Sequence, residues 1–568
     1  FKALLDYTAS SSYSWHSPGH GGGVAFRKSP VGRAFHDFFG ENTLRSDLSV
    51  SVPGLGSLLD HTGPVAEAEA NTARTFGADH SFYVVNGTST SNKIIWHAYV
   101  TRDDLVLVDR NCHKSILHAI IMTGAIPIYL SGSRNDYGII GPIGREAFAP
   151  AALQQLIDEH PLLDGSKRQI KLAVLTNSTY DGLCYNTEMI KDQLQDSVDV
   201  LHFDEAWYGY AAFHPFYHGR HGMSEKVAAP RAKHPLVFAT QSPHKVLAAL
   251  SQASIILAKD STEQQLDRER FNEAYMMHTS TSPHYGIIAS IDVATGMMAG
   301  PAGKSLVQET LDEALSFRRA MQQTAEQMAE EEWWFDVWEP EAALALPELK
   351  ASDWTLDDQA EWHGFGHMSS DFAMLDPIKV SLLTPGVEEK GRLAKSGIPA
   401  ALVTRFLAER GLVVEKTGLY SFLILFSLGI TKGKWSTLLS ELREFKRLYD
   451  QDAPLELTLP SLAQHPRYQG LGLRTLGERL HQCYKKHSLI KLMRQMYTTL
   501  PQISLRPADA YQQMVRGEVE SVPVSALAGR LSAVMLVPYP PGIPVIMPGE
   551  RFPHDNNSIV DYLAAAIE

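Results

Sequence analysis

Cysteine is scarce in this sequence, with three residues among 568. Cys112, Cys184 and Cys483 lie far apart and are odd in number, so they match neither a disulfide framework nor a zinc-binding pattern. We therefore expect a reducing, cytoplasmic location. No charged and then apolar signal segment follows Phe1, and the sequence leaves open whether a further domain precedes this residue.

Long apolar runs and a basic charge balance are also absent. The sequence has no stretch of about 18 uninterrupted apolar residues, which is the usual pattern of a membrane-spanning helix. Asp and Glu (64) outnumber Lys and Arg (51), which gives a formal net charge of -13. This balance argues against a nucleic-acid partner, because phosphate binding needs a basic surface. It suits a small cationic substrate.

The length of the chain exceeds what one hydrophobic core supports, so we expect two or three domains. Residues 1–65 are rich in Gly, Ser and Pro, which favours irregular loops over regular elements. The changes in pattern along the chain suggest an N-terminal linker (1–50), a large domain (51–300), a small α+β domain (301–452) and a C-terminal domain (453–568).

Short apolar strands alternate with helix-length segments between residues 81 and 239. Strands of this kind, buried on both faces, indicate a mainly parallel sheet in an α/β fold. They are expected at 81–85, 105–109, 171–176, 198–204 and 236–239. A long helical period over 304–334 could bridge to a second, α+β region. There we expect strands at 379–383 and 412–415 and helices at 399–409 and 433–449, followed by a helical and then proline-rich segment.

Ser242-Pro-His-Lys245 is the most informative short segment, and an apolar run of small residues (246–257) follows it. A lysine in this setting could form an imine with an aldehyde cofactor, while Ser242 and His244 meet a phosphate. The structural alternative is a surface lysine near a helix start, and an isolated motif of this length favours that alternative.

The predicted strand 198–204 delivers Asp204 at its C-terminal end. Open α/β sheets bind ligands outside the carboxyl ends of their strands, so this carboxylate stands where a cofactor would be met. It could keep a pyridine nitrogen protonated and so make the ring an electron acceptor. Capping of the following segment is an equally good interpretation of Asp204 alone.

A third feature is the run 84–92, in which Gly87 permits a tight turn before the hydroxyl and N–H groups of Thr88 and Ser89. Such a helix start is either a phosphate cradle or a plain cap. His113, four residues after the strand 105–109, could stack on an aromatic ring, although a lone histidine is more often structural. Each feature alone is weak evidence, and their order along one sheet is what favours a cofactor site.

Taken in order, these and further motifs resemble the bacterial ornithine, lysine and arginine decarboxylases, which are fold-type-I pyridoxal-phosphate enzymes. The resemblance spans essentially the whole chain. The matching segments are 15–23 (WHSPGHGGG), 40–47 (GENTLRSD), 109–115 (DRNCHKS), 204–207 (DEAW), 276–283 (MMHTSTSP), 375–380 (LDPIKV) and 539–542 (YPPG). It implies a fold-type-I large domain with a mainly parallel sheet, a smaller α+β domain and a C-terminal domain.

The resemblance also implies roles for individual residues. Pyridoxal 5′-phosphate would be bound covalently by Lys245, its pyridine nitrogen would pair with Asp204, and His113 would stack on its ring. The remaining cofactor contacts would come from Thr88, Ser89, Ala206, Trp207, Ser242 and His244, and from Ser280 and Thr281.

In the family, a Ser/Thr segment like 279–282 and a glycine-rich loop like that near His20 approach the site of a partner subunit. The resemblance therefore implies a homodimer with shared active sites, in which residues 1–50 take part in dimerisation, and a higher oligomer such as a decamer is open. One departure from the family is Pro243, where threonine is usual. Proline lacks an N–H group and restricts φ, so one phosphate donor or the local turn is expected to differ.

The implied reaction is decarboxylation of a basic amino acid. The electrons of the Cα–carboxylate bond flow into the cofactor as CO₂ leaves, and Lys245 or His244 then protonates Cα. The reaction consumes a proton and yields an amine, which associates such enzymes with acid stress and polyamine metabolism.

Glu415 is the candidate partner for the distal ammonium group of the substrate, because an unpaired buried ammonium is costly. The alternative is a solvated strand-end carboxylate. The form Glu415-Lys-Thr-Gly resembles the lysine-decarboxylating members, which favours L-lysine over arginine and ornithine. Two remote alternatives are an aminotransferase, for which no second carboxylate-binding arginine stands out, and a non-catalytic family member, for which Pro243 is the only hint.

Overall fold

The computed structural model describes residues 1–568 except 11–14, 50, 164–168, 226–234, 347, 499, 539–542, 556 and 568. The YPPG segment at 539–542, one of the motifs behind the family resemblance, therefore lies outside the described residues.

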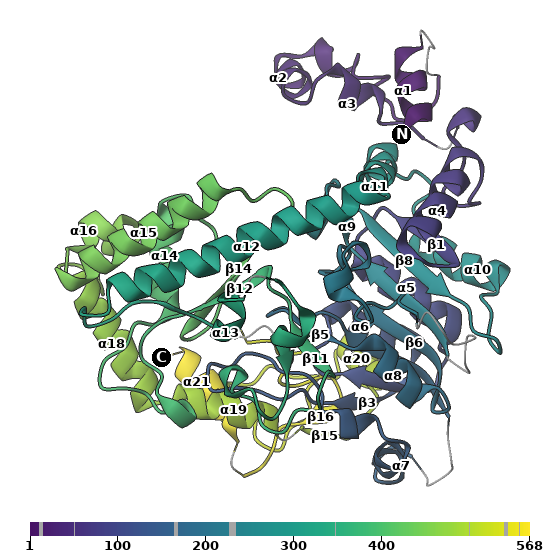
Figure 1. Cartoon of the computed structure of the whole chain (residues 1–568). Coiled ribbons are helices and arrows are strands. Elements are labelled where there is room, and N and C mark those ends of the chain that lie inside the picture. The colour runs from purple at the N-terminus through teal and green to yellow at the C-terminus, as the bar shows by residue number, and fades with distance from the viewer. Residues whose placement is uncertain are drawn as a thin grey trace.

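Seven strands form the large sheet, in the order β1-β8-β7-β6-β4-β2-β3 (Figure 1). The neighbours β7, β6, β4, β2 and β3 run parallel, whereas β8 is antiparallel to both β1 and β7. The strands are β1 (His80–Val84), β2 (Leu105–Asp109), β3 (Ile126–Leu130), β4 (Ile170–Thr176), β6 (Val198–Asp204), β7 (Leu236–Gln241) and β8 (Ser254–Lys259). All five predicted strands of the large sheet are present, and the mainly parallel α/β fold is confirmed.

Two strands of this sheet, β3 and β8, were not predicted. β8 lies partly within the apolar run that follows Lys245, and its residues are buried from Ser254 to Ala258. A continuous apolar run has no alternation of polar and apolar residues, so its sequence does not distinguish a buried strand from other buried structure.

Helices cover the faces of the sheet and join its parallel strands. α5 (Thr88–Tyr99) packs on β1, β7 and β8 and is itself covered by α6 (Lys114–Thr123) and α10 (Arg268–His278). α4 (Gly63–Phe76) and α11 (Tyr285–Met298) pack together beside β1. The other helices of this region are α7 (Pro150–Asp158), α8 (Thr187–Leu194) and α9 (Pro243–Val246).

The long helix α12 (Pro301–Gln327) runs from the large sheet to a second region (Figure 1). It ends earlier than the predicted 334. The second region has an antiparallel sheet in the order β13-β14-β12-β9, which packs against α12 and α14, while α15 packs on both of these helices. The bounds are β9 (Asp336–Val337), β12 (Lys379–Leu383), β13 (Lys416–Thr417), β14 (Ser421–Leu425), α14 (Ala400–Glu409) and α15 (Lys432–Asp450). A third sheet pairs β10 (Thr355–Leu356), β11 (Ala373–Leu375) and β5 (Leu183–Tyr185).

The prediction of a strand at 412–415 was wrong, because the strand is β13, which begins at Lys416. Val413 is 86% exposed, so its apolar side chain is not packed against a sheet. The Glu415 N–H donates to the Leu423 carbonyl at 2.9 Å, which places Glu415 at the entrance to β13.

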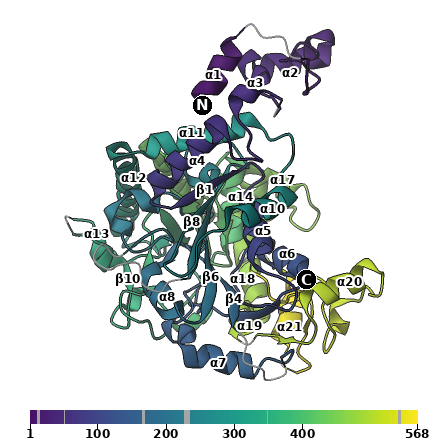
Figure 2. The ribbon, with the colours of Figure 1, turned by 90° about the vertical axis from the view of Figure 1, so that its right-hand side faces the viewer.

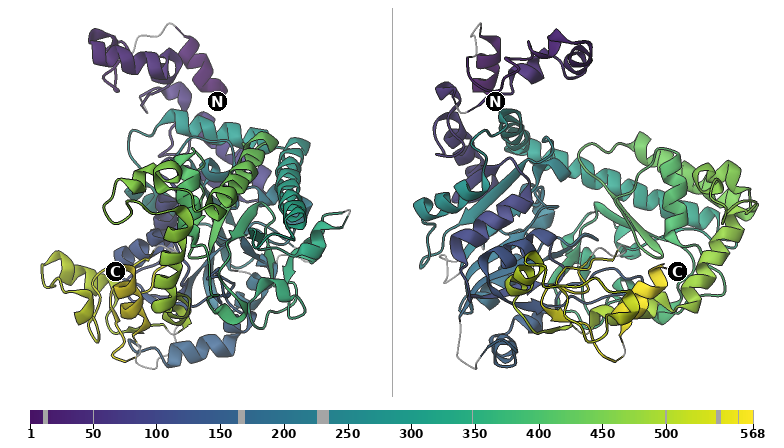
Figure 3. Two further views of the ribbon diagram at one scale, coloured as in Figure 1. Left: turned by 90° about the vertical axis from the view of Figure 1, so that its left-hand side faces the viewer. Right: turned by 180° about the vertical axis from the view of Figure 1, so that it is seen from behind.

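The N-terminal residues form helices, so the prediction of irregular loops over 1–65 was also wrong in part. These helices are α1 (Lys2–Ala9), α2 (Pro30–Phe39) and α3 (Glu41–Arg45). The Ser29 hydroxyl accepts a hydrogen bond from Gly32 N at 3.0 Å, and Pro30 is the first helical residue, which together start α2. α2 and α3 stand away from the body of the molecule in every view (Figures 1, 2 and 3).

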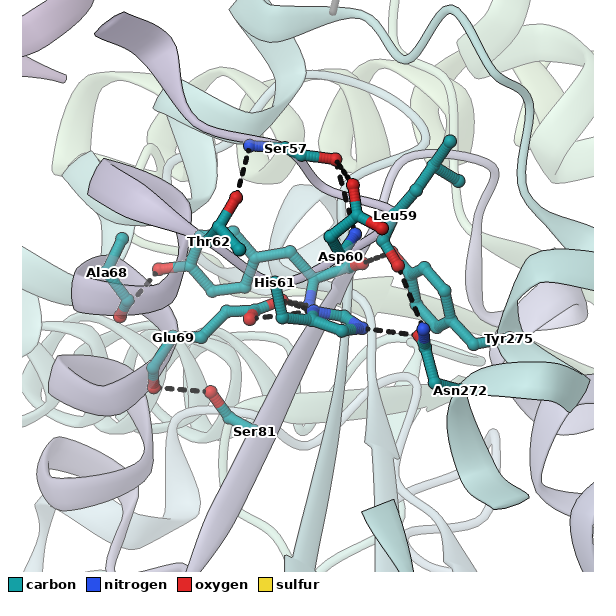
Figure 4. Close-up of polar contacts among 11 residues, drawn as sticks. Ser57, Leu59, Asp60, His61, Thr62, Ala68, Glu69, Ser81, Asn272 and Tyr275 are labelled. Atoms are coloured by element: carbon teal, nitrogen blue, oxygen red, sulfur yellow. Dashed lines mark hydrogen bonds and ion pairs between the residues drawn. The ribbon is translucent and has the colours of Figure 1, made fainter. Parts of the chain in front are cut away.

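His61 fixes the chain between these helices and α4 (Figure 4). Its Nδ1 lies 2.9 and 3.1 Å from the carboxylate oxygens of Glu69, and its Nε2 lies 3.1 Å from Asn272 Oδ1 on α10. Asn272 Nδ2 donates to the Leu59 carbonyl, which turns Oδ1 toward the histidine. Both ring nitrogens of His61 face acceptors, and the buried side chains of His61 and Glu69 lie within ion-pair distance of each other, at 2.9 Å.

The C-terminal region packs back onto the large sheet (Figure 3). Arg110, directly after β2, donates to the two carboxylate oxygens of Glu550 at 2.6 and 2.8 Å, and both side chains are buried. The elements here are α18 (Leu473–Lys486), α19 (Leu489–Thr498), α20 (Pro507–Val515), α21 (Ser558–Ile567), β15 (Gln502–Ile503) and β16 (Glu550–Arg551). Among the described residues, no helix has the length and apolar character needed to span a bilayer.

Candidate active site

Asp204 ends β6 at the carboxyl edge of the sheet and is 5% exposed. Its Oδ2 accepts a hydrogen bond from Asn92 Nδ2 at 3.0 Å, and its Oδ1 accepts one from Ala206 N at 3.3 Å. A carboxylate accepts up to about four hydrogen bonds. Asp204 is therefore held in place and still able to accept an N–H group from a ligand.

Lys245 follows the neighbouring strand β7 on the short helix α9. Its Nζ lies 4.2 Å from the centre of the Trp207 ring. Burial lowers the pKa of Lys245, while the charges of Asp204 and Glu415 oppose that shift. A lysine whose pKa is lowered is a better nucleophile at neutral pH, so Lys245 has the character of a residue that attacks an aldehyde.

Pro243 is the first residue of α9, where a missing N–H group leaves no helical hydrogen bond unmade. Lys245 N donates to the Ser242 carbonyl at 3.0 Å and Leu247 N to the Pro243 carbonyl at 2.8 Å, so the turn closes with proline present. The departure from the family at this position is thus compatible with a regular turn.

The start of α5 lies beside this turn. Its N-cap is Gly87, with a φ of 76° and no side-chain cap, followed by Thr88 and Ser89. The Thr88 hydroxyl lies 2.6 Å from the Ser242 hydroxyl and 2.8 Å from that of Ser254. An uncapped helix start with adjacent hydroxyl groups has the chemistry of a phosphate site.

Two histidines border the same space. His113 is the N-cap of α6, and its Nδ1 accepts a hydrogen bond from Ser115 N at 3.2 Å. Burial lowers the pKa of His113, Asp204 raises it and Lys245 lowers it, so its ring is within electrostatic reach of both residues. His244 Nδ1 donates to the Ala253 carbonyl at 2.7 Å, and burial lowers its pKa.

Glu415 is exposed and accepts a hydrogen bond from the Tyr180 hydroxyl at 2.6 Å. The Tyr180 ring lies 5.3 Å from the Trp207 ring, which in turn faces the Lys245 amine. The aromatic rings of Tyr180 and Trp207 therefore lie between Glu415, which belongs to the small α+β region, and Lys245.

Ser280 and Thr281 lie elsewhere. Both are exposed in the connection between α10 and α11, where Ser282 N donates to the Ser280 hydroxyl at 3.1 Å. The structure does not bring them into the buried cluster of their own chain. The residues that it does bring together are Thr88, Ser89, His113, Asp204, Ala206, Trp207, Ser242, His244 and Lys245.

Comparisons with known proteins bear on this arrangement. Residues 1–434 match the family model "Orn/Lys/Arg decarboxylase, major domain", and residues 490–568 match the model of its C-terminal domain. The chain belongs to the ornithine, lysine and arginine decarboxylase family. This confirms the resemblance that the sequence motifs indicated.

Individual members of this decarboxylase family are similar over the whole chain. "Lysine decarboxylase LdcA" of Pseudomonas aeruginosa is 63% identical over 568 residues, which are 100% of this chain and 75% of that protein. "Biodegradative arginine decarboxylase" of Escherichia coli is 44% identical, with 99% and 77% covered. The solved structure "Lysine decarboxylase A from Pseudomonas aeruginosa" superposes with a TM-score of 0.96 at 62% identity and covers 100% of this chain and 75% of that one.

Three further residues contact the candidate site and were not predicted from the sequence. Asn92 closes the hydroxyl-rich run 84–92, and its position one helical turn after Thr88 was the available signal. Ser254 and Tyr180 gave no signal, because Ser254 begins an unpredicted strand and Tyr180 meets Glu415 from a distance of 235 residues.

Proposed function

We propose that this chain is a pyridoxal-5′-phosphate-dependent decarboxylase that converts L-lysine to cadaverine and CO₂. The observation that carries the proposal is the convergence of Lys245, Asp204 and the uncapped start of α5 at the carboxyl edge of one sheet. The name of the relative that is 63% identical supports lysine as the substrate, and arginine and ornithine are the alternatives.

The residues present fit this cofactor. The first-turn N–H groups of α5 with the hydroxyl groups of Thr88, Ser89 and Ser242 suit a phosphate dianion, and Asp204 suits a protonated pyridine nitrogen. When bound, pyridoxal phosphate supplies an aldehyde that bonds to an amine and a ring that accepts an electron pair. We propose that the cofactor is held by Lys245, Asp204, His113, Thr88, Ser89, Ser242, His244, Ala206 and Trp207, and by Ser280 and Thr281 of a partner subunit.

The protein side chains divide the remaining work. Asp204, oriented by Asn92 and Ala206 N, would keep the ring nitrogen of a bound cofactor protonated, and that positive charge would favour loss of CO₂. Lys245, whose pKa is lowered by burial, would release its proton readily near neutral pH and would donate it to Cα once CO₂ has left. We favour Lys245 over His244 for this step, because the His244 ring is already engaged with the Ala253 carbonyl.

Glu415 is proposed to bind the ammonium group at the far end of the substrate. Its charge raises the pKa of Lys245, so the two residues are within electrostatic reach of each other. An ammonium ion leaving water needs an anionic partner. The carboxylate of Glu415 meets that need, and the aromatic rings of Tyr180 and Trp207 between it and Lys245 suit an aliphatic chain.

We further propose a homodimer with shared sites. Ser280 and Thr281 are exposed in this chain, and the projecting helix α2 exposes apolar side chains such as Val31 (84%) and Phe38 (83%), which a second copy would cover. A higher oligomer such as a decamer is compatible with the same surfaces. We also propose that the chain is divided into domains at 1–50, 51–300, 301–452 and 453–568. The order of the sheets and helices along the chain supports these boundaries.

A cytoplasmic location is proposed from the three free cysteines, two of which are buried.

Parallel assays test the reaction and its substrate. The protein loaded with pyridoxal phosphate is expected to release CO₂ from lysine with a higher kcat/KM than from arginine or ornithine. A preference for either of the other two amino acids would overturn the substrate assignment. Release that requires an added keto acid would overturn decarboxylation in favour of an aminotransferase.

A further inference from the structure

Two consecutive pairs of residues connect the large sheet to the small α+β region. Tyr180 donates to Glu415 Oε1 at 2.6 Å, and the carboxylate of Asp181 accepts hydrogen bonds from Lys416 Nζ at 2.7 and 2.8 Å. Asp181 and Lys416 are largely buried, with side chains 3% and 12% exposed. This ion pair fixes the register of the two segments, so that Tyr180 and Glu415 meet beside it.

The turn that carries Tyr180 is held from several sides. Thr179 N donates to the Leu183 carbonyl at 2.8 Å, and Leu183 N donates to the Thr179 hydroxyl at 3.0 Å. The buried Lys379 from β12 donates to the Ser178 hydroxyl at 2.5 Å and to the Thr179 carbonyl at 3.2 Å. Tyr180 therefore projects from a rigid support.

The Glu415 side chain is less constrained. Its backbone N–H bonds to the Leu423 carbonyl at the entrance to β13, but the side chain is exposed, and the residues before it, 412–414, are irregular. A glutamate side chain has three rotatable bonds, so an exposed one samples many positions. The bond from Tyr180 selects one of these positions.

The Tyr180 ring extends this arrangement toward the reacting end of the site. It lies 5.3 Å from the Trp207 ring at an angle of 51°, and Lys245 Nζ lies 4.2 Å from the centre of the Trp207 ring. A continuous series of contacts thus connects Lys245 through Trp207 and Tyr180 to Glu415. Tyr180 is the only one of the four that touches both an aromatic neighbour and the carboxylate.

We propose that Tyr180 is a specificity-determining positioning residue, which holds the Glu415 carboxylate at the distance from Lys245 that matches the distal ammonium group of the substrate. The inference deepens the proposed function and rests on it. It predicts that the Tyr180 hydroxyl contributes to binding of the charged end of the substrate and not to the chemistry at Cα.

The test compares wild type, Tyr180→Phe, Glu415→Gln and the double variant, each loaded with pyridoxal phosphate. The KM for lysine reports on the charged end, and the inhibition constant of norleucine, which lacks only the distal amino group, reports on the rest of the site. Tyr180→Phe is expected to raise the KM about tenfold, as for loss of a hydrogen bond to a charged group, with kcat and the norleucine constant unchanged. The double variant should be no weaker than Glu415→Gln alone, because both changes remove one interaction.

Several results would overturn the inference. An unchanged KM, or a norleucine constant that rises in parallel with the KM, would show that the hydroxyl has no role or only a structural one. Crystal structures give a readout independent of turnover, since the Glu415 carboxylate should occupy a different rotamer in Tyr180→Phe. Tyr511→Phe, a change at a 42% exposed tyrosine on α20, is the matched control and should alter neither constant. If Tyr180→Phe does not fold, Tyr180→Met serves instead.

Failure of the proposed function is distinguishable from failure of this inference. If wild type decarboxylates ornithine or arginine in place of lysine, the substrate assignment fails, and the comparison is repeated with that amino acid and its uncharged analogue. If wild type decarboxylates lysine and Tyr180→Phe behaves as wild type, the inference alone fails. If no basic amino acid is decarboxylated, both fail.

Discussion

Asn92 donates to Asp204 at 3.0 Å from a position one helical turn beyond Thr88. Its second amide hydrogen goes to the Ser115 hydroxyl at 2.9 Å, and its Oδ1 accepts from the Thr240 hydroxyl at 2.8 Å. One fully buried side chain thus joins the helix that offers a phosphate site, the strand that carries Asp204, and the elements on either side. The relative positions of the two groups that we propose to bind the cofactor depend on this residue.

Replacement of Asn92 by alanine is therefore expected to weaken both folding and cofactor binding. The substitution removes the hydrogen-bond partner of Asp204, Ser115 and Thr240. Their buried polar groups are then unsatisfied, which costs about 1–3 kcal/mol of stability. Asn92→Asp should be worse for cofactor binding, because a second carboxylate would face Asp204 and repel it. Titration of each variant with pyridoxal phosphate, followed by absorbance, measures the affinity. Equal affinity of Asn92→Asp and wild type would contradict the proposed role of Asp204 as the partner of a protonated ring.

Lys245→Arg keeps a positive charge but removes the primary amine. We expect kcat to fall by about 10³-fold or more, because neither the bond to the aldehyde nor the proton transfer to Cα remains available. The variant should also lose its visible absorbance on dialysis, since the cofactor is no longer covalently bound. Lys304→Arg, a change at an exposed lysine on α12, is the control and should retain both properties. Turnover by Lys245→Arg near the wild-type rate would remove Lys245 from the mechanism.

Much of the large sheet could be predicted from the sequence, because strands buried on both faces appear as short apolar runs with helix-length spacing. β8 could not be predicted, because Ser254–Ala258 continues an apolar segment that has no alternation of polar and apolar residues. The helices in 1–65 were hidden by a composition rich in glycine, although Ser29 and Pro30 form a recognisable helix start.

Part of the candidate site could also be predicted from the sequence, and part could not. Asp204 ends one predicted strand, and Lys245 follows the predicted strand 236–239 after a short turn. The order of the strands brings these two segments together, so their approach could be expected. The contact of Tyr180 with Glu415 joins an irregular turn to the approach of a two-residue strand, 235 residues apart. No periodicity or local motif encodes such a contact, because it depends on how two regions of the chain pack together.

Glu69→Gln tests the buried ion pair with His61. The substitution removes the carboxylate that faces His61 Nδ1 in a site where the two side chains are 8% and 5% exposed. Breaking a buried pair in this way costs about 3–5 kcal/mol, so the melting temperature should fall markedly. Glu67→Gln, an exposed change on the same helix, should have little effect. If the two variants melt at the same temperature, the pair contributes nothing to stability.

Acid is expected to destabilise the protein through His202, the buried histidine two residues before Asp204. The Thr240 hydroxyl gives its hydrogen to Asn92, so it accepts from His202 Nε2 at 3.0 Å, and this leaves Nδ1 as the unprotonated nitrogen. Nδ1 is buried and has no hydrogen-bond partner within the described part of the chain. Burial lowers the pKa of His202 from 6.5 to about 4, against an opposing effect of Asp204.

The sign of the pH dependence follows from this shift. The unfolded histidine takes up a proton below pH 6.5, whereas the folded one resists it until about pH 4, so the stabilising contribution is complete above 6.5 and is lost as the pH falls toward 4. The loss from this one group is about 3 kcal/mol. His202→Phe should start less stable at pH 7.5, because the bond to Thr240 is gone, and should show a flatter decline in melting temperature between pH 6.5 and 4. His465→Phe, at an exposed histidine, should keep the wild-type decline. A wild-type decline in His202→Phe would mean that other groups, and not His202, govern acid stability.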